Sequence, residues 1–544
     1  MYVRSLGSIV GLFLLSAFGA AHDSASLTPN IPSISAENVK AHITVLADDA
    51  LMGRDADSEG FDKAADYVKM QMKALGLKPG AGDGYFQPVT LRSHNASADG
   101  AEMILHGAGG DEALEFKTEF IPGSSSSLEQ SEIRAPLVFA GYGIDAPEIG
   151  HDDFEGLDVE GKIILILSGA PAQFQSEERA YYSSSKAEMA EAHGAIGIIT
   201  FLSKASEKHF SFERLGKSFG RKRMVWTHAD GRSKNDDSGI KATAAVSSAV
   251  VTKLFETVSK SFEDIRTEAE TSMPKGFALP YEVTLKTKSV HERAESENVI
   301  GILEGSDPVL RNEFVVLSAH LDHVGIGHAV DGDEIYNGAL DNAAGISTML
   351  EVARAFKNAE EKPKRSIIFL AVTAEEKGLV GSDYFAHNPT VEKSSIVADV
   401  NLDMPLILYD FADVIAFGAD RSSLGPLVKS AAAQLNVGLS PDPLPDLSLF
   451  VRSDHYRFVQ QGVPSVFLVT GFNAVGEDGK GGEIFKNFLN THYHKPSDDL
   501  NLPIDFKAGA KFAKINYLIA RNIANASERP HWNEGDFFGS KYAK

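Results

Sequence analysis

The sequence predicts an α/β protein with a mostly parallel, mixed main sheet that is flanked by helices on both faces. Short apolar runs alternate with helical patterns from about residue 298 to residue 526, an order typical of strand–helix–strand units. Groups of polar residues follow the apolar runs 314–317 and 366–372. Such runs are typical of buried parallel strands, and ligands bind at the carboxyl edge where these strands end.

Length and composition limit the possible functions. A chain of 544 residues is too long for one ordinary core, so at least two domains are expected. The formal net charge of −23 argues against a nucleic-acid partner, which requires a basic surface. The chain has no cysteine, which excludes disulfides, thiolate metal ligands, a cysteine nucleophile and a cysteine-linked lipid.

Residues 1–21 are predicted to be a secretory signal peptide. Arg4 supplies the positive charge, residues 6–18 are apolar, and Gly19-Ala20-Ala21 offers small residues for cleavage. A retained membrane anchor is the alternative, but the apolar run is short for a membrane-spanning helix. We therefore expect a secreted or periplasmic protein with no stable membrane insertion after cleavage.

The N-terminal part of the catalytic domain is predicted over residues 34–130. Residues 34–77 have helical spacing in two segments, and residues 85–122 alternate like strands. The turn Leu51-Met52-Gly53-Arg54 lies between the two helical segments. We expect this turn to approach the active edge of the sheet.

A smaller, β-rich α+β domain is predicted as an insertion over residues 131–270. Strands are expected at 136–144, 162–167 and 194–201, and helices at 185–193 and 251–265. Residues 203–240 are rich in Lys, Arg, Ser, Asp and Gly and are expected to form a long surface loop, with Lys217, Arg221, Lys222 and Arg223 on a solvated face. The insertion has no cluster of ligand-type residues, so we interpret it as a structural or substrate-gating module.

The catalytic part is predicted over residues 271–535, and it contains candidate ligands at successive strand ends. These are His320, Asp341, Glu376, Asp403 and one of His492 and His494. Imidazoles combined with carboxylates suit zinc or a similar divalent ion. If Asp341 bridges two ions, each ion has one His, one further carboxylate, the shared Asp and a position for water. Two such ions can share a hydroxide. Alternatively, Asp341 only caps the helix that starts at Asn342 or Ala343.

Three further side chains have candidate roles in catalysis. Glu375 and Glu376 are neighbours on an extended segment, so their side chains diverge and Glu375 is free to act as general base. Asp322 is two residues from His320 and could hold its imidazole from behind. Tyr493 could donate its hydroxyl to a developing oxyanion.

The motifs together resemble the co-catalytic di-zinc aminopeptidase family, which includes aminopeptidase S, aminopeptidase Y and the more distant glutamate carboxypeptidases. The resemblance covers roughly residues 40–120 and 285–535. Its motifs are Ala319-His320-Leu321-Asp322-His323, Gly338-Ala339-Leu340-Asp341-Asn342-Ala343-Ala344-Gly345, Thr373-Ala374-Glu375-Glu376-Lys377-Gly378, Asn401-Leu402-Asp403-Met404, Arg452-Ser453-Asp454-His455 and Tyr493-His494-Lys495-Pro496-Ser497-Asp498.

The resemblance implies a role for each matching residue. One zinc ion would be held by His320, Asp341 and Asp403, and the other by Asp341, Glu376 and His494. His494 is preferred to His492 because Lys-Pro-Ser-Asp follows it, as in the family. Glu375 matches the general base, Tyr493 the oxyanion-stabilising tyrosine of some members, and Arg452 a residue that contacts substrate in some members.

The inserted region also resembles a known domain. Ala140-Gly141-Tyr142-Gly143, the stretch 158–162 and Gly194-Ala195 are similar to the protease-associated (PA) domain, which several members of this family carry within the peptidase domain. The expected function is that of a secreted or periplasmic zinc exopeptidase that removes N-terminal residues from peptides, using a metal-bridging hydroxide and Glu375 as general base.

The sequence is also compatible with three other functions. A carboxypeptidase requires an arginine cluster for the substrate carboxylate, and no clear cluster is visible in the sequence. A glutaminyl cyclase-like transferase would bind one zinc ion and release ammonia from N-terminal Gln. A non-enzymatic binding protein would lose ligands that this chain retains.

Overall fold

The computed structural model describes residues 31–208, 210–233, 235–256 and 258–543. The signal peptide predicted at residues 1–21 lies outside this part of the chain. Within it, none of the helices combines the length and the apolar character needed to cross a membrane.

A large mixed sheet organises the chain, and its central strands are parallel. β13 (Phe314–His320) lies between β16 (Ser366–Val372) and β17 (Ile396–Leu402), and β17 pairs in parallel with β20 (Ser465–Thr470). β12 (Phe277–Leu303) continues the sheet antiparallel to β16. The predicted fold class is confirmed, including a mostly parallel core of the catalytic part.

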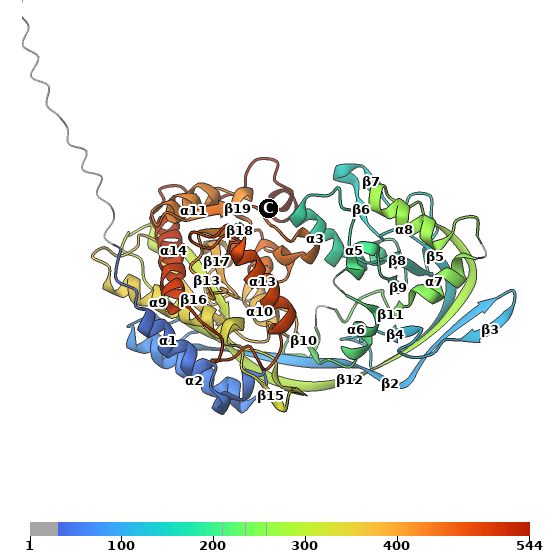
Figure 1. Cartoon of the computed structure of the whole chain (residues 1–544), viewed down its shortest axis with the longest axis horizontal. Helices are drawn as coiled ribbons and strands as arrows, with labels where there is room; N and C mark the ends of the chain where they lie inside the picture. Colours follow the sequence, from blue (N-terminus) through green and yellow to red (C-terminus); the bar gives the residue numbers. More distant parts are fainter. Residues whose placement is uncertain (1–30, 209, 234, 257, 544) are drawn as a thin grey trace, which may run out of the picture.

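Helices cover both faces of this sheet (Figure 1). On one face α1 (Ala36–Leu46), α9 (Ala344–Asn358) and α14 (Phe506–Asn525) pack together over the inward side chains of Val315 and Leu317. On the other face Phe385 of α10 (Val380–His387) and Phe458 of α12 (His455–Val459) pack against Val316. Consecutive residues of β13 thus face opposite cores, as the alternation of side chains along a strand requires.

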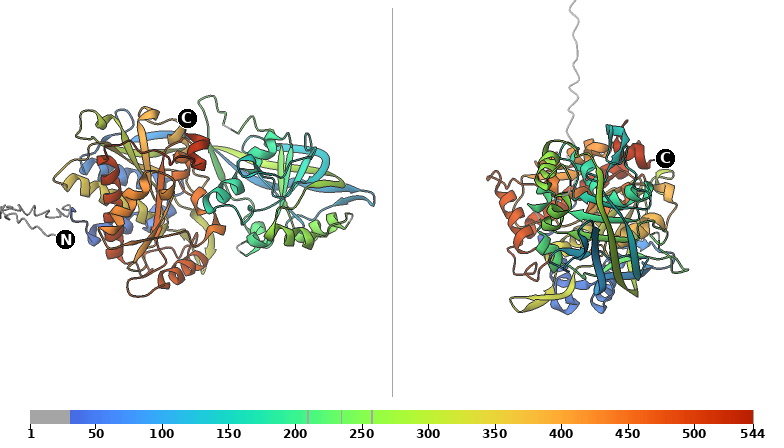
Figure 2. Two further views of the ribbon diagram at one scale, coloured as in Figure 1. Left: turned by 90° about the horizontal axis from the view of Figure 1, so that it is seen from above. Right: turned by 90° about the vertical axis from the view of Figure 1, so that its right-hand side faces the viewer.

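Two long strands join the catalytic part to the inserted region. β2 (Phe86–Gly107) pairs antiparallel with β12 along most of its length, and both strands run from one lobe to the other in Figures 1 and 2. In the second lobe β5 (Gln130–Phe139) pairs with β12. The remaining core strands follow in parallel as β8 (Ile163–Leu167), β9 (Gly197–Phe201) and β11 (Ala242–Val246). The inserted region therefore extends the main sheet.

Residues 203–240 contain regular structure, so the prediction of one long loop is wrong. They form α5 (Lys204–Glu207), α6 (Phe212–Lys217) and β10 (Arg223–Trp226), which pairs antiparallel with β2. Met224 and Trp226 are buried against Leu91, because β10 presents alternate side chains to a small apolar cluster. The sequence did not indicate this short strand, because charged residues precede its two buried side chains.

The predicted helix over residues 251–265 is also wrong as a single element. The structure has α7 (Ser248–Phe255) and α8 (Phe262–Thr271). Ser261 begins α8 with a capping box, since its hydroxyl accepts from the amide of Asp264 and the Asp264 carboxylate accepts from the amide of Ser261. Such a box marks the start of a new helix.

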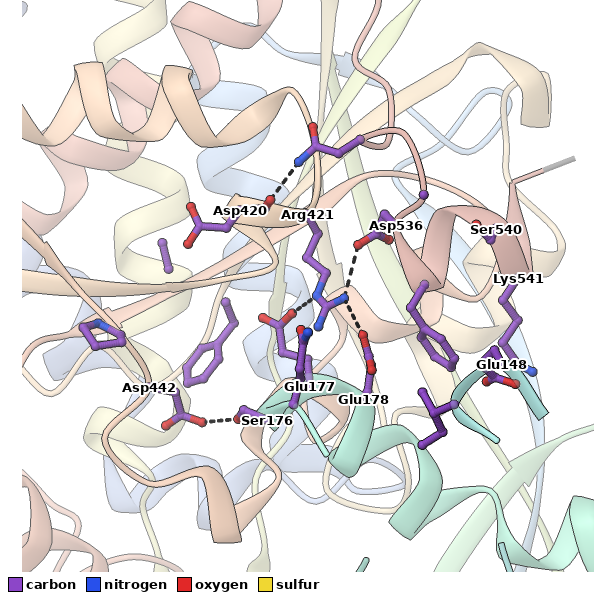
Figure 3. A pocket seen from close by; sticks show the side chains of 18 of the residues that line it. Glu148, Ser176, Glu177, Glu178, Asp420, Arg421, Asp442, Asp536, Ser540 and Lys541 are labelled. Atoms are coloured by element: carbon purple, nitrogen blue, oxygen red, sulfur yellow. Dashed lines mark hydrogen bonds and ion pairs between the residues drawn. The ribbon is translucent and has the colours of Figure 1, made fainter. Parts of the chain in front are cut away.

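The inserted lobe touches the catalytic part at a second place, around α3 (Ser176–Ser184). The guanidinium of Arg421 donates to the carboxylates of Glu177, Glu178 and Asp536 beside a cavity of about 1100 Å³ (Figure 3). Burial raises the pKa of Glu177 although Arg421 opposes the shift. Ion pairs from one arginine thus connect α3 to the catalytic part of the chain.

The turn between α1 and α2 (Glu59–Ala74) approaches the active edge, as predicted. Gly53 has φ of +70°, and a Cβ at this position would lie 2.4 Å from the carbonyl oxygen of Tyr336 and 2.6 Å from that of Gly325. Only glycine accommodates both the left-handed backbone and this close approach. The turn is thereby fixed against the hairpin β14–β15 (Gly325–Val330 and Asp333–Tyr336).

Arg54 connects this turn to two loops that carry candidate ligands. Its guanidinium donates to the carbonyl oxygens of Leu321 (2.9 Å), Asn337 (2.6 Å) and Gly338 (3.1 Å), and also to that of Leu46. The side chain is almost completely buried. One arginine thus satisfies four backbone acceptors that water cannot reach.

We expect Arg54→Met to destabilise the protein while keeping much of the apolar side-chain volume. A buried acceptor left without a donor costs about 1–3 kcal/mol, so the free energy of unfolding should fall by roughly 3 kcal/mol or more. Urea unfolding followed by tryptophan fluorescence measures this change. The exposed Arg232→Met is the matched control, and equal urea midpoints for the two variants would contradict the assigned role.

Candidate active site and metal centre

The predicted ligand residues meet at the carboxyl edge of the central strands. His320 is the last residue of β13, Glu376 follows β16, and Asp403 follows β17. Asp341 lies in the short π-helical turn Ala339–Ala343 that leads into α9, and His494 follows α13 (Lys480–Thr491). Five side chains from five separate segments are therefore brought to one place.

The donor atoms form two groups that share one carboxylate. In the first group, Nε2 of His320 lies 3.2 Å from Oδ1 of Asp341 and 3.1 Å from Oδ1 of Asp403. In the second group, Nε2 of His494 lies 3.2 Å from Oδ2 of Asp341 and 3.0 Å from Oε2 of Glu376. Asp341 contributes one oxygen to each group, which is the arrangement of a bridging ligand.

These distances fit two divalent ions. Ligands 2.0–2.1 Å from a tetrahedral zinc ion have donor atoms about 3.3 Å apart, close to the separations of both groups. Oε1 of Glu376 and both ring nitrogens of His323 are buried and make no hydrogen bond, although Glu376 Oε1 and His323 Nδ1 lie 2.7 Å apart. Buried polar atoms of this kind are expected where a cation belongs.

Opposite charges set the protonation of the second group. Burial favours the neutral form of Glu376, but His494 and His323 outweigh it and hold the pKa of this carboxyl well below its usual range. Burial disfavours the charged form of His494, but Glu376 and Asp341 raise its pKa to about 10. The pocket therefore attracts positive charge strongly, and a divalent ion can replace the protons of the imidazoles.

Two buried carboxylates hold the backbone of the ligand loops. Asp322 accepts from the amides of Glu375 (3.0 Å) and Glu376 (3.2 Å). Asp498 accepts in the same way from the amides of Leu340 and Asp341, at 3.0 Å each. Burial raises the pKa of both carboxyls to about 6. Each carboxylate fixes one loop by two adjacent amides.

Asp322 holds the imidazole of His320, as predicted, but through its backbone. The backbone oxygen of Asp322 lies 3.0 Å from Nδ1 of His320, while the carboxylate accepts from the amide of Glu375. The alternative role of Asp341 as a helix cap is wrong. Oδ1 of Asn342 accepts from the amide of Gly345 at 2.9 Å, so the neighbouring residue caps the helix and Asp341 is free for the cluster.

Glu375 lies beside the first donor group and not within it. Its Oε2 is 4.0 Å from Nε2 of His320, whereas the Glu376 side chain turns to the second group. Burial, together with the charges of Asp403 and Glu376, raises the pKa of Glu375 well above its usual range. The predicted divergence of the two neighbouring glutamates is confirmed.

The structure adds residues that the sequence did not single out. His323 lies against Glu376, and its presence three residues after His320 was the only signal. Ser453 donates to Oδ2 of Asp403 at 2.6 Å and accepts from Nδ2 of Asn401 at 2.5 Å. These side chains come together only through the fold, because Asn401 and Ser453 lie on different segments.

The donor groups open into a pocket of about 520 Å³. Tyr493 lines it, with its ring stacked on that of His494 at 3.8 Å, and Arg452 also lines it. Nine apolar side chains form a large part of the wall, namely Phe210, Met404, Leu444, Leu447, Leu449, Phe467, Val469, Phe485 and Leu489. Pockets of this size accept small molecules or short peptide segments.

His492 and His494 have different environments. Nδ1 of His492 lies 2.9 Å from Oγ of Ser497, outside the two donor groups, whereas His494 contacts both Asp341 and Glu376. Of the two candidates, the structure brings only His494 into the cluster of described residues.

A parallel sheet with paired carboxylate and imidazole groups at its carboxyl edge defines an α/β metallohydrolase. Residues 298–519 match the model of Peptidase family M28, so the catalytic part of this chain is similar to that family. The predicted resemblance to co-catalytic zinc peptidases is thereby confirmed.

Individual relatives and a solved structure agree with this assignment. Aminopeptidase YwaD of Bacillus subtilis (strain 168) is 26% identical over 404 residues, which cover 74% of this chain and 69% of that protein. Leupeptin-inactivating enzyme 1 of Streptomyces exfoliatus is 28% identical over 233 residues, which cover 41% of this chain and less than half, 47%, of that protein. The solved aminopeptidase from Aneurinibacillus sp. strain AM-1 matches with a TM-score of 0.53 at 20% identity, over 92% of this chain and 98% of its own. This structural match supports the fold.

We expect His494→Ala to lose one of two bound zinc ions on dialysis, because Asp341 and Glu376 then lose the imidazole that contacts both, and only His323, 3.8 Å from Asp341, remains beside them. His492→Ala is the matched control and should keep two ions, since its ring is bonded to Ser497. Metal content per chain, measured by inductively coupled plasma mass spectrometry after dialysis, distinguishes the two variants. Loss of zinc from His492→Ala with retention in His494→Ala would reverse the assignment.

Proposed function

We propose that this protein is a zinc-dependent aminopeptidase that hydrolyses N-terminal residues from peptides. The observation that carries the proposal is the pair of donor groups that share Asp341 within a pocket that also contains Glu375. The names of the relatives, which include aminopeptidases and zinc metalloproteases, support it.

The five ligand side chains divide between two zinc ions in this proposal. His320, Asp341 and Asp403 would hold one ion, and Asp341, Glu376 and His494 would hold the other. When bound, the two ions polarise the carbonyl group of the scissile peptide bond and lower the pKa of water. The charges balance, because two divalent ions bring +4 and the carboxylates of Asp341, Glu376, Asp403 and Glu375 bring −4.

Glu375 moves the proton in this mechanism. Its carboxylate accepts a proton from the attacking water and then delivers it to the nitrogen of the leaving amine. Burial raises the pKa of Glu375 and the charge of His320 opposes this rise; further positive charge at the donor groups would favour the ionised carboxylate that the first step requires. Tyr493, which lines the same pocket, orients the carbonyl oxygen through its hydroxyl.

A zinc carboxypeptidase is the second candidate, and one observation favours it. Arg452 lines the pocket together with Lys208, Arg214 and Lys486, so cations for a substrate carboxylate are present after all. A glutaminyl cyclase-like transferase that binds one zinc ion fits less well, because two donor groups that share Asp341 meet at this pocket.

The remaining sequence predictions belong to the same proposal. We infer that residues 1–21 direct the protein out of the cytoplasm and that residues 131–270 form a PA domain. The position of this lobe beside the pocket, to which it contributes Lys208 and Arg214, supports a role in substrate access.

We expect the purified protein to cleave a tripeptide with a blocked C-terminus and to leave one with a blocked N-terminus intact. Leu-Gly-Phe-amide should release leucine, and N-acetyl-Leu-Gly-Phe should release nothing, because an aminopeptidase requires the free amine. Product analysis by liquid chromatography, with and without chelator, measures both. The opposite pattern, with release of Phe from the acetylated peptide, would establish the carboxypeptidase.

We expect Glu375→Gln to retain two zinc ions and to lower kcat by about 10²–10⁴-fold, because a positioned general base contributes roughly that factor. Metal content and hydrolysis of leucine p-nitroanilide measure the two effects separately. Glu334→Gln, on an exposed part of β15, is the matched control and should behave like wild type. Near-normal turnover of the Glu375 variant would remove this residue from the mechanism.

A further inference from the structure

The pocket beside the donor groups carries a ring of positive side chains. We call Lys208, Arg214, Arg452 and Lys486 the cationic rim, and all four line the pocket and are exposed. The acidic residues that line the same pocket are Asp341, Glu375 and Asp403, all of which belong to the metal centre. Once two divalent ions balance those carboxylates, Lys208, Arg452 and Lys486 leave the lining of the pocket with an excess of positive charge.

The rim is assembled from both lobes. Lys208 and Arg214 come from the segment that contains α5 and α6 in the inserted lobe, whereas Arg452 and Lys486 come from the catalytic part. The guanidinium carbon of Arg214 lies 5.7 Å from the centre of the Phe210 ring, which also lines the pocket. The inserted lobe therefore supplies part of the wall facing the metal centre.

Three of the four rim residues have no carboxylate partner among the described residues. In the described part of the chain, Lys208, Arg452 and Lys486 have no ion pair, although the whole sequence has a net charge of −23 and many exposed lysines and arginines are paired. Burial raises the pKa of the Tyr493 phenol, and the positive charge of Arg452 opposes this rise. Four cations gathered at one pocket of an acidic protein are suited to bind an anionic group of the substrate.

We propose that the cationic rim binds the C-terminal carboxylate of short peptides, so that the substrates are free oligopeptides of a few residues. The proposal rests on the proposed aminopeptidase function and names its substrate class. The apolar wall receives side chains, the metal centre receives the scissile bond, and the rim receives the carboxylate downstream of that bond. A pocket of about 520 Å³ accommodates a peptide of this length and not a folded chain.

The test compares matched peptides with a free and an amidated C-terminus. The series Leu-Gly, Leu-Gly-Gly and Leu-Gly-Gly-Gly is measured as acid and as amide, and the ratio of the two kcat/KM values isolates the carboxylate. We expect wild type to prefer the acid about tenfold at one or more of these lengths. The preference should shrink when NaCl rises from 0.05 to 0.5 M, because salt screens exposed charges.

Variants of the inserted lobe test the origin of this preference. Lys208→Met and Arg214→Met should each lower the acid-to-amide ratio about two- to fivefold, the effect of one exposed charge pair, and the double variant should bring it near one. Arg221→Met is the matched control, because Arg221 is exposed in the same lobe and does not line the pocket. This control should keep the wild-type ratio.

A further pair of peptides separates the two possible sources of the carboxylate. Leu-Gly-Glu-amide and Leu-Gly-Gln-amide differ only in a side-chain charge. Equal rates for both support recognition of the terminal carboxylate, whereas a preference for the glutamate peptide as large as that for a free C-terminus overturns it.

The outcomes also separate this inference from the proposed function. Hydrolysis of acids and amides at equal kcat/KM, or a preference that the Lys208→Met/Arg214→Met double variant retains in full, overturns the role of the rim and leaves the aminopeptidase intact. Failure to hydrolyse leucine p-nitroanilide and every peptide of the series would instead reject the proposed function itself.

Discussion

The density of buried carboxylates at one edge of the sheet is the constraint on which the site depends. Asp341, Glu375, Glu376 and Asp403 lie within a few ångströms of one another, and burying charge without compensation is very costly. Imidazoles, backbone amides and divalent cations provide the compensation. The compensation requires several segments to meet. The ends of β13, β16 and β17 and the turn before α9 each place a charged or imidazole side chain at this edge of the sheet.

Supporting carboxylates make the convergence rigid. Asp322 and Asp498 each bind two adjacent amides of a ligand loop, and Arg54 binds four carbonyl oxygens of the surrounding turns. These are charge-assisted bonds in a water-poor environment, where hydrogen bonds are strong and unsatisfied groups are expensive. The positions of the ligand side chains are therefore set largely by hydrogen bonds to the backbone, in which the metal-binding atoms take no part.

Much of the catalytic part could be predicted from the sequence, because apolar strands and polar strand ends follow one another at short range. β17 and the ligand set were visible in this way. The function of the Asp322 carboxylate was not, since it depends on a partner more than fifty residues away, as the hydrogen bond to Glu375 shows. β10 was missed because only two of its residues are buried, and the pocket-lining role of Lys208 arises from the placement of a whole lobe.

The ladder between β2 and β12 has a mechanical consequence for substrate selection. The two strands pair from Glu282 to Val299 of β12, with one irregularity near Lys286. Both lobes are therefore connected by the same antiparallel pair of strands. Moving the lobes far apart would distort this pair of strands and strain the backbone hydrogen bonds between them. The distance between the lobes is therefore limited when the chain folds, and under the proposed function it would restrict the width of the peptides that reach the pocket.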